Sequence, residues 1–297
     1  MMEIAPPNSL YHLSKSYLIQ LASEFRSSTQ SAINCTPRLD NIWYLAAAST
    51  FTACNEPQEI PKLYHFALLR ESNLNKGSLS DVVIAERVMK LFEKDRPTRI
   101  AILDEWYSKP NRAQVLITQR FQETILKSSS LTGLPKAINS LQKLAEEIPR
   151  SFQIEQPRVL KDEKDYNKLF PNVMRDIHMS KEEVVKRGMD CWNSIYSTTA
   201  EKVTNNINKT YPDLWYFIMA HVYGPILSHT AVLSSQETSL IIIAALVPQD
   251  VNAQLWGHMK GAINIGCDKH AIERIRMLSI AISKYCGAKW KEGVAKL

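Results

Sequence analysis

An unbroken apolar run of eight residues, LIIIAALV at positions 240–247, constrains this chain more than any other feature. The run lies inside the stretch 233–272, where Pro248 ends it and a second helical segment follows that carries Trp256, His258 and Lys260. It is much shorter than the roughly 20 apolar residues that a membrane-spanning helix needs. We therefore expect no membrane span, and we expect a candidate site between this apolar helix and the helix after it.

Helical periodicity continues along the rest of the chain. Residues 39–54 are apolar on most sides and predict a central helix, whereas the aromatic segment 212–223 predicts a helix that Gly224-Pro225 breaks. No segment shows a sustained alternation of apolar and polar residues, and the chain has only 9 glycines, which disfavours a sheet protein rich in turns. The sequence therefore predicts an all-α fold.

The basic residues do not indicate a nucleic-acid partner. The formal net charge is +6, and the densest basic patches, 96–99 and 181–187, are interleaved with acidic residues. A nucleic-acid footprint is usually a denser basic patch than these. We expect no nucleic-acid binding.

The cysteine pattern predicts neither a disulfide framework nor a metal site. The five cysteines are widely spaced and no C-x-x-C occurs, so a compartment that keeps thiols reduced fits best. Glycine-rich phosphate loops and the motifs of zinc proteases and serine hydrolases are also missing from the sequence. We expect no cofactor and no metal.

A change of composition divides the chain. Residues 148–172 are polar, contain three prolines, and carry the charge run Lys161-Asp162-Glu163-Lys164-Asp165, which is typical of a linker. The expected organisation is an N-terminal extension, a first helical unit, a linker, a second helical unit and a C-terminal tail, at residues 1–37, 38–150, 151–174, 175–290 and 291–297.

Two parts of the chain look like copies of one helical unit. Each has an Ala-rich apolar helix, WYLAAAS in the first half and LIIIAALV in the second. Each then has a polar break with one proline, Pro57 or Pro248, and a helix in which a histidine follows an aromatic residue, His65 or His258. A repeated hairpin of this kind indicates an internal duplication.

The stretch 233–272 resembles the carboxymuconolactone decarboxylase family, which is related to the alkylhydroperoxidase D-like fold. The family motif H-x-x-x-A-x-x-x-G reads here His258, Ala262 and Gly266, after the Ala-rich helix. Residues 121–148 of the first half resemble the family's closing helices with their Gly-x-Pro-x-Ala-x-Asn segment. The resemblance implies two tandem units of this family, and a homo-oligomer, a dimer or a trimer, because single units of the family bury apolar helices between copies.

The sequence departs from the family pattern at three places. Thr238 stands where the family often has arginine, the second half lacks the Gly-x-Pro segment, and the C-x-x-C of the peroxidase branch is absent before His258. A carboxylate substrate would therefore lack its obvious cationic partner.

His258 and Glu237 are the candidate catalytic residues. An imidazole that titrates near neutrality can donate a proton to the carbanion left by decarboxylation, or take one in a lactone isomerisation. The alternative for His258 is a structural histidine bonded to a backbone carbonyl group. The resemblance implies that Glu237 relays protons, but it could equally well only stabilise the N-terminus of its helix beside Ser234 or Ser235.

Three further residues are expected to line the same substrate pocket. His221, Tyr223 and His229 cluster just before the apolar helix. Together with His258 they predict a pocket for a small-molecule ligand.

The residues Ala295, Lys296 and Leu297 form a small–basic–Leu tripeptide, a close variant of the Ser-Lys-Leu peroxisomal address. An import receptor reads such an address at a free carboxylate end, so these residues should be exposed. The expected partner is the peroxisomal import receptor, and the expected location is the peroxisomal matrix.

Two functions from different classes stay open. The first is a cofactor-free enzyme that resembles the decarboxylase and acts on a small carboxylated substrate. The second is an inactive binding or structural member of the fold, and a peroxide-detoxifying hydroperoxidase is a lesser alternative. An enclosed cavity with both candidate catalytic residues pointing into it would favour the enzyme.

Overall fold

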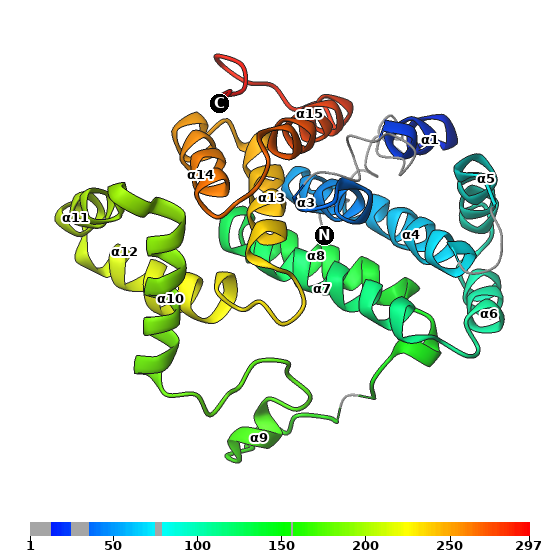
Figure 1. Ribbon diagram of the computed structural model, residues 1–297. Helices are drawn as coiled ribbons and strands as arrows, with labels where there is room; N and C mark the ends of the chain where they lie inside the picture. Colours follow the sequence, from blue (N-terminus) through cyan, green and yellow to red (C-terminus); the bar gives the residue numbers. More distant parts are fainter. Residues whose placement is uncertain (1–12, 25–35, 75–78, 156) are drawn as a thin grey trace, which may run out of the picture.

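The computed structural model describes residues 13–24, 36–74, 79–155 and 157–297, which form helices joined by turns and loops, without a strand (Figure 1). The prediction of an all-α protein is confirmed. Most of the predicted N-terminal extension, and Cys35 with it, lies outside the described residues. The part of it that is described includes α1, which buries Leu18, Leu21 and Ala22.

The helices of the first half come before the irregular segment that starts near residue 153. In chain order they are α1 (Lys15–Glu24), η2 (Leu39–Asn41), α3 (Trp43–Cys54), η3 (Pro57–Glu59), α4 (Ile60–Leu74), α5 (Asp81–Phe92), α6 (Arg96–Trp106), α7 (Arg112–Thr132), α8 (Leu134–Glu147) and η4 (Arg150–Phe152).

The second half includes one π-helix, η6. Its helices, with the short α9 of the preceding irregular segment, are α9 (Tyr166–Leu169), α10 (Lys181–Tyr196), η5 (Ser197–Thr199), α11 (Ala200–Thr210), α12 (Pro212–Phe217), η6 (Ile218–Leu227), α13 (Ser235–Leu246), η7 (Val247–Gln249), α14 (Asn252–Asn264) and α15 (Lys269–Tyr285).

The core is built around α3 and α13. Every residue of α3 except Cys54 is buried, and so are residues 238–246 of α13, as expected for helices that are apolar on all sides. The two helices contact each other directly: the Ser49 hydroxyl donates to the Ile241 carbonyl oxygen at 2.8 Å. Both α7 and α15 pack against both central helices (Figure 1), so the two halves of the chain share one core.

The same backbone turn follows both central helices. Asn55 (φ 59°, ψ 43°) and Glu56 (φ −112°, ψ 60°) connect α3 to the next helix, while Asp250 (φ 57°, ψ 39°) and Val251 (φ −115°, ψ 62°) do so after η7. Asn and Asp tolerate this left-handed conformation better than most residues. The chain therefore makes the same turn into η3, which leads directly into α4, and into α14.

The prediction that Gly224-Pro225 breaks a helix was wrong. The chain continues as η6 through Pro225 to Leu227. Glycines let η6 lie directly on α10, because a Cβ atom on Gly188 would stand 2.7 Å from the Gly224 nitrogen. Side chains from other elements bond the carbonyl groups at the end of η6, so the proline does not leave them unpaired.

Where it is described, the irregular segment 153–180 contains only α9, and it runs along the lower edge of Figure 1. Arg175, near its end, forms a bidentate ion pair with Glu123 of α7, at 2.7 and 2.9 Å. Ser180 then caps α10 with a capping box, in which Ser180 and Glu183 each accept the other's backbone N–H.

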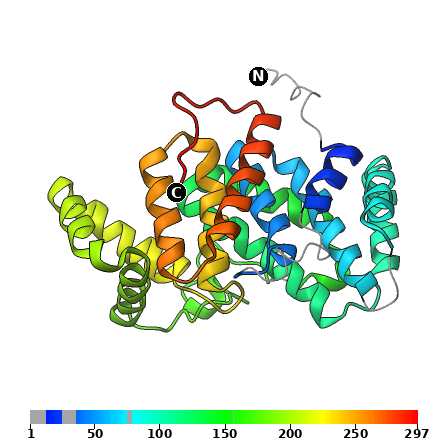
Figure 2. The same cartoon turned by 45° about the horizontal axis from the view of Figure 1, so that its top comes forward.

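The C-terminal tail turns back over α14 (Figure 2). Gly287, with φ 78°, follows the end of α15 and turns the chain into the tail. The Ala295 N–H donates to Asn252 Oδ1 at 2.8 Å, whereas Lys296 and Leu297 are exposed. Among the described residues, no helix is long and apolar enough to cross a membrane.

Candidate ligand-binding site

A cavity of about 70 Å³ lies in the second half, between α10, α13 and α14. That volume holds on the order of five water molecules, so it suits a ligand of only a few non-hydrogen atoms. The side chains that line it are mostly small and uncharged: Cys191, Ser194, Ile195, Leu227, Ser235, Thr238, Ser239, Ile242, His258 and Ile265.

Helical spacing explains the wall formed by α13. Ser235, Thr238, Ser239 and Ile242 are three or four residues apart, which places them on one face of the helix. Ser234 fixes where the helix begins, because its hydroxyl accepts the Glu237 N–H at 3.2 Å in a capping box. The cap therefore sets which face of α13 meets the cavity.

A glycine sets the distance between α10 and α14. A Cβ atom on Gly261 would stand 2.5 Å from Ile195 Cγ2, so only glycine permits this approach. Asn264 holds the crossing with a 2.7 Å bond from Nδ2 to the Ile195 carbonyl oxygen. His258 precedes Gly261 by one helical turn, and the crossing brings it to the cavity opposite α10.

His258 is the polar centre of the cavity. Its side chain is partly buried, and removal from solvent lowers its pKa to about 4, so the imidazole is neutral at pH 7. It has no hydrogen-bonding partner among the residues that the structure describes, and it is not locked against a carbonyl group. The imidazole of His258 therefore does not titrate near neutrality as the sequence led us to expect. It is a neutral ring that can both donate and accept a hydrogen bond.

Thr238 adds a second open polar group. Its Oγ1 atom is buried and lacks a hydrogen-bonding partner in the described part of the protein. An unpaired buried hydroxyl normally costs about 1–3 kcal/mol, which a ligand or a water that bonds to it would recover. Thr238 and His258 thus offer a ligand two polar groups in a cavity that is also lined by three serines, a cysteine and four aliphatic side chains.

The cavity carries no formal charge. Burial raises the pKa of the Cys191 thiol, so that it stays protonated, and His258 is neutral. Within the described ranges, no ionised side chain lines the walls. An anionic ligand must therefore enter with a proton, or create a charged partner on binding.

Glu237 does not line the cavity. One carboxylate oxygen accepts from Arg120 Nη2 of α7 at 2.8 Å, and the other accepts the Ser234 N–H at 2.9 Å. Glu237 precedes Thr238 by one residue, so its side chain leaves α13 about 100° away from the cavity wall. The structure does not bring the two catalytic candidates together, and it gives Glu237 a capping and ion-pairing role.

The other three predicted pocket residues also lie outside the cavity lining. His221 is exposed and its ring contacts Tyr216 and Phe217. Tyr223 is buried against Trp192, and burial raises the pKa of its phenol. His229 is buried just after η6, where burial lowers its pKa.

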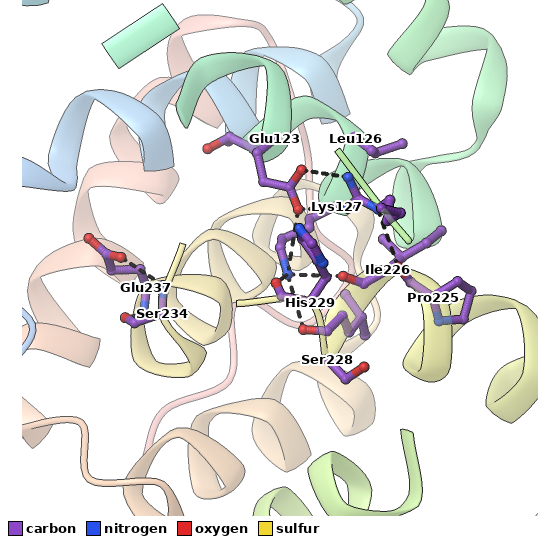
Figure 3. Close-up of polar contacts among 12 residues, drawn as sticks. Glu123, Leu126, Lys127, Pro225, Ile226, Ser228, His229, Ser234 and Glu237 are labelled. Carbon is purple, nitrogen blue, oxygen red and sulfur yellow. Dashed lines mark hydrogen bonds and ion pairs between the residues drawn. The ribbon is translucent and has the colours of Figure 1, made fainter. Parts of the chain in front are cut away.

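The sequence did not predict the buried lysine that contacts the end of η6. Lys127 of α7 is fully buried, and its ammonium donates to the carbonyl oxygens of Ile226, Leu227 and His229 at 3.0, 3.0 and 2.8 Å (Figure 3). Burial lowers its pKa to about 8, against the opposing attraction of Glu123. Figure 3 also shows Glu237 and Ser234 as a separate pair, apart from this cluster.

Two arginines bond the remaining carbonyl groups of the same helix end. Arg175 Nε donates to the Pro225 oxygen at 3.3 Å, and Arg187 Nη2 donates to the Gly224 oxygen at 3.0 Å. Cations at a helix C-terminus are favourable, because the helix dipole is negative there. The cluster therefore stabilises η6, which supplies Leu227 to the cavity.

His65 is a structural histidine. It is fully buried, its Nε2 donates to the Glu147 carbonyl oxygen at 2.9 Å, and burial lowers its pKa to about 3. Counted from the repeated turn, the residue eight positions after Asn55 is Leu63, and the residue eight positions after Asp250 is His258. In this register the first half has leucine in place of the cavity histidine.

The described residues hold no group of three or more His, Cys, Asp or Glu side chains arranged to bind a metal ion. His221 and His229 do not line the cavity beside His258.

Comparison with known proteins identifies relatives along most of the chain. It is 45% identical over 268 residues to Peroxisomal protein 2 of Saccharomyces cerevisiae, covering 88% of this chain and 94% of the relative. The chain belongs to the peroxisomal protein 2 family. A second member, Peroxisomal protein 2 of Schizosaccharomyces pombe, is 35% identical over 181 residues, 61% of this chain and 76% of that protein.

The family membership confirms the predicted location, and the protein is peroxisomal. No family model matches the chain, and no solved structure matches it. The resemblance to carboxymuconolactone decarboxylase therefore stays a hypothesis about this peroxisomal protein 2 family member.

Proposed function

We propose that this peroxisomal protein performs cofactor-free acid–base chemistry on a small ligand bound beside His258. One observation carries the proposal: the His258 imidazole lines the cavity and has no hydrogen-bonding partner among the described residues. A structural histidine, such as His65, is instead bonded to a carbonyl group. A second unpaired group, the Thr238 hydroxyl, is available to orient the ligand.

A small carboxylate fits this chemistry because its negative charge favours the protonated form of His258. The imidazole is neutral when the cavity is empty, but a carboxylate placed beside it raises its pKa by favouring the imidazolium. When the bond to the carboxyl carbon breaks, CO₂ leaves and the electron pair stays on the neighbouring carbon. That carbon then takes the proton from the imidazolium.

We further propose that the chain consists of two tandem units like those of carboxymuconolactone decarboxylase, at residues 38–150 and 175–290. The repeated turn at Asn55 and Asp250 supports this duplication. The packing of α7 and α15, each on both central helices, supports it as well. In this proposal only the second unit keeps the histidine, and the predicted dimer or trimer stays a prediction.

His258→Ala is expected to abolish turnover. Purified protein and the variant are incubated with a metabolite extract, and consumption is followed by mass spectrometry. A metabolite that the unmodified protein consumes should be consumed at least about 100-fold more slowly by the variant, which is the ordinary contribution of a general acid. His221→Ala, outside the cavity, is the control and should retain turnover.

An inactive binding protein is the second candidate, and a specific observation favours it. The cavity contains neither a cation nor the Glu237 carboxylate, so a decarboxylase would have to rely on His258 alone. In that case the unmodified protein and His258→Ala would consume no metabolite. A ligand that co-purifies with the unmodified protein and is lost from the variant would then establish binding without catalysis.

We propose that Ala295, Lys296 and Leu297 are the import address that the peroxisomal receptor reads. Lys296 and Leu297 are exposed, whereas Ala295 is partly buried and donates its N–H to Asn252 Oδ1, a bond that a receptor can displace. Removal of Leu297 is expected to leave a fluorescently tagged protein in the cytosol, as seen by microscopy. Lys291→Ala, outside the tripeptide, should still reach peroxisomes, and import without Leu297 would refute the assignment.

A further inference from the structure

A groove of about 180 Å³ opens between α5 and α6, across the core from α14 and the His258 cavity (Figures 1 and 2). That volume holds on the order of twelve water molecules, so the groove can take a larger ligand than the cavity can. Three cations and three apolar side chains line it: Arg87, Lys90, Leu91, Lys94, Ile102 and Trp106. The groove therefore combines positive charge with an apolar surface.

Helical spacing builds the two walls of the groove. The four lining residues on the α5 side are three or four positions apart, which places them on one face, and Lys94 continues that face just past the end of the helix. Ile102 and Trp106 are one helical turn apart on α6. Asp95 caps α6 directly after Lys94, because its carboxylate accepts the Thr98 N–H at 3.0 Å. The two faces therefore lie on either side of a short connection.

The floor of the groove is apolar. Leu91 is buried and Ile102 is partly buried, but 42% of Trp106 is exposed. An indole this exposed leaves a large apolar area in contact with water, and covering such an area is favourable. The floor therefore suits an alkyl chain.

The rim of the groove carries excess positive charge. The side chains of Arg87, Lys90 and Lys94 are exposed, and no acidic side chain lines the groove. Lys90 lies 3.6 Å from the carboxylate of Glu86, which also lies 4.0 Å from Lys15. Among the residues that the structure describes, Arg87 and Lys94 form no ion pair. An anionic ligand would therefore meet two cations that no carboxylate of the protein already neutralises.

We propose that the groove between α5 and α6 binds a medium-chain fatty acid. Its carboxylate lies among the three cations of the rim, and its alkyl chain lies on the floor beside Trp106. A chain of about ten carbons fits the volume, because a methylene group takes up about as much space as a water molecule.

Charge complementarity and the apolar floor together select this class of ligand. A small inorganic anion would leave the Trp106 indole exposed, and a neutral lipid would leave the cations of the rim without a partner. The groove is separate from the His258 cavity, so the proposal does not depend on the chemistry there.

The test titrates the full-length protein with decanoate at concentrations below micelle formation. Isothermal titration calorimetry measures binding, and tryptophan emission should move to shorter wavelength as the chain covers Trp106. Trp106→Phe should still bind decanoate but lose this shift, which locates the alkyl chain. Decanol, which has the same chain without the charge, should bind roughly tenfold more weakly.

Variants of the rim locate the carboxylate. Arg87→Gln combined with Lys94→Gln should weaken decanoate binding roughly tenfold and leave decanol binding unchanged. Lys161→Gln combined with Lys168→Gln removes the same number of exposed charges from the irregular segment and is the matched control. It should bind decanoate as the unmodified protein does.

His258→Ala separates the groove from the cavity and should also bind decanoate normally. Absence of decanoate binding, full binding by the double variant of the rim, or loss of binding in His258→Ala would overturn the proposal. Binding to vesicles that contain an anionic phospholipid, without binding of monomeric decanoate, would also overturn it and would make the groove part of a membrane-facing surface.

Discussion

Lys127→Met is expected to lower the free energy of unfolding by about 3 kcal/mol, which corresponds to a fall in Tm of roughly 6–10 °C. Methionine keeps the length and apolar contacts of the lysine stem but leaves three buried carbonyl oxygens of Ile226, Leu227 and His229 unpaired. Each unpaired buried group costs about 1–3 kcal/mol. Part of this cost is offset because the variant no longer has to bury an ammonium group. Denaturant unfolding followed by circular dichroism measures the difference.

Lys143→Met is the matched control. Lys143 lies on α8, its side chain is about half exposed, and it pairs with Glu146 at the surface. Its replacement should change the free energy of unfolding by less than about 0.5 kcal/mol. Equal stability of the two variants would mean that Lys127 does not hold η6.

The contribution of Lys127 should also depend on pH. Its pKa in the folded protein is lowered to about 8 from an ordinary value of 10.5, so between these values the unfolded chain binds the extra proton. Stability from this group therefore rises with pH across that window. The difference between the unmodified protein and Lys127→Met is expected to grow by about 2 kcal/mol from pH 7 to pH 10, whereas a constant difference would contradict the assigned pKa.

Gly261→Leu is expected to destabilise the protein by about 3 kcal/mol and to abolish ligand binding in the cavity. Even a Cβ atom at this position would stand 2.5 Å from Ile195 Cγ2 and 3.3 Å from the Ile195 carbonyl oxygen. The larger side chain must push α14 away from α10, which moves His258 relative to Thr238. Thermal unfolding, together with the metabolite assay, reports both effects.

Gly257→Leu provides the control on the same helix. No atom lies within 4 Å of the position where a Cβ would be added, and leucine favours a helix over glycine by roughly 0.5–1 kcal/mol. This variant should therefore be slightly more stable than the unmodified protein. If both leucine variants lost similar stability, the close crossing of α10 and α14 would not be the reason that position 261 requires glycine.

The sequence predicted an internal repeat, but it did not fix the register between the two halves. The apolar runs and polar breaks indicated that α3 and α13 are similar helices. The shared backbone turn at Asn55 and Asp250 then gave a residue-by-residue alignment of the two halves. The aromatic–His pairs suggested that His65 matches His258, whereas counting from the turn matches Leu63 to it. Periodicity alone does not locate a helix boundary to within one or two residues. The register between the two halves therefore had to come from the backbone angles of the turn.

The residues of the candidate site also differ in how far the sequence predicted them. His258 was found from its motif, because histidine at a set distance after an Ala-rich helix is a local pattern. Helix capping was one of the two roles that the sequence left open for Glu237, but its ion pair was not predicted, because Arg120 comes from α7, more than 100 residues earlier. Lys127 left no local signal either, because a lysine on an amphipathic helix normally faces solvent.

The sequence by itself predicted a helical protein, an apolar helix at residues 240–247 and a peroxisomal location, and the relatives confirm that location. Local periodicity carries the helical information along the chain. Only the tertiary structure decided which polar groups share a cavity and which cation bonds the end of η6. Such contacts join residues from different helices, and only the packing of these helices around α3 and α13 sets their distances.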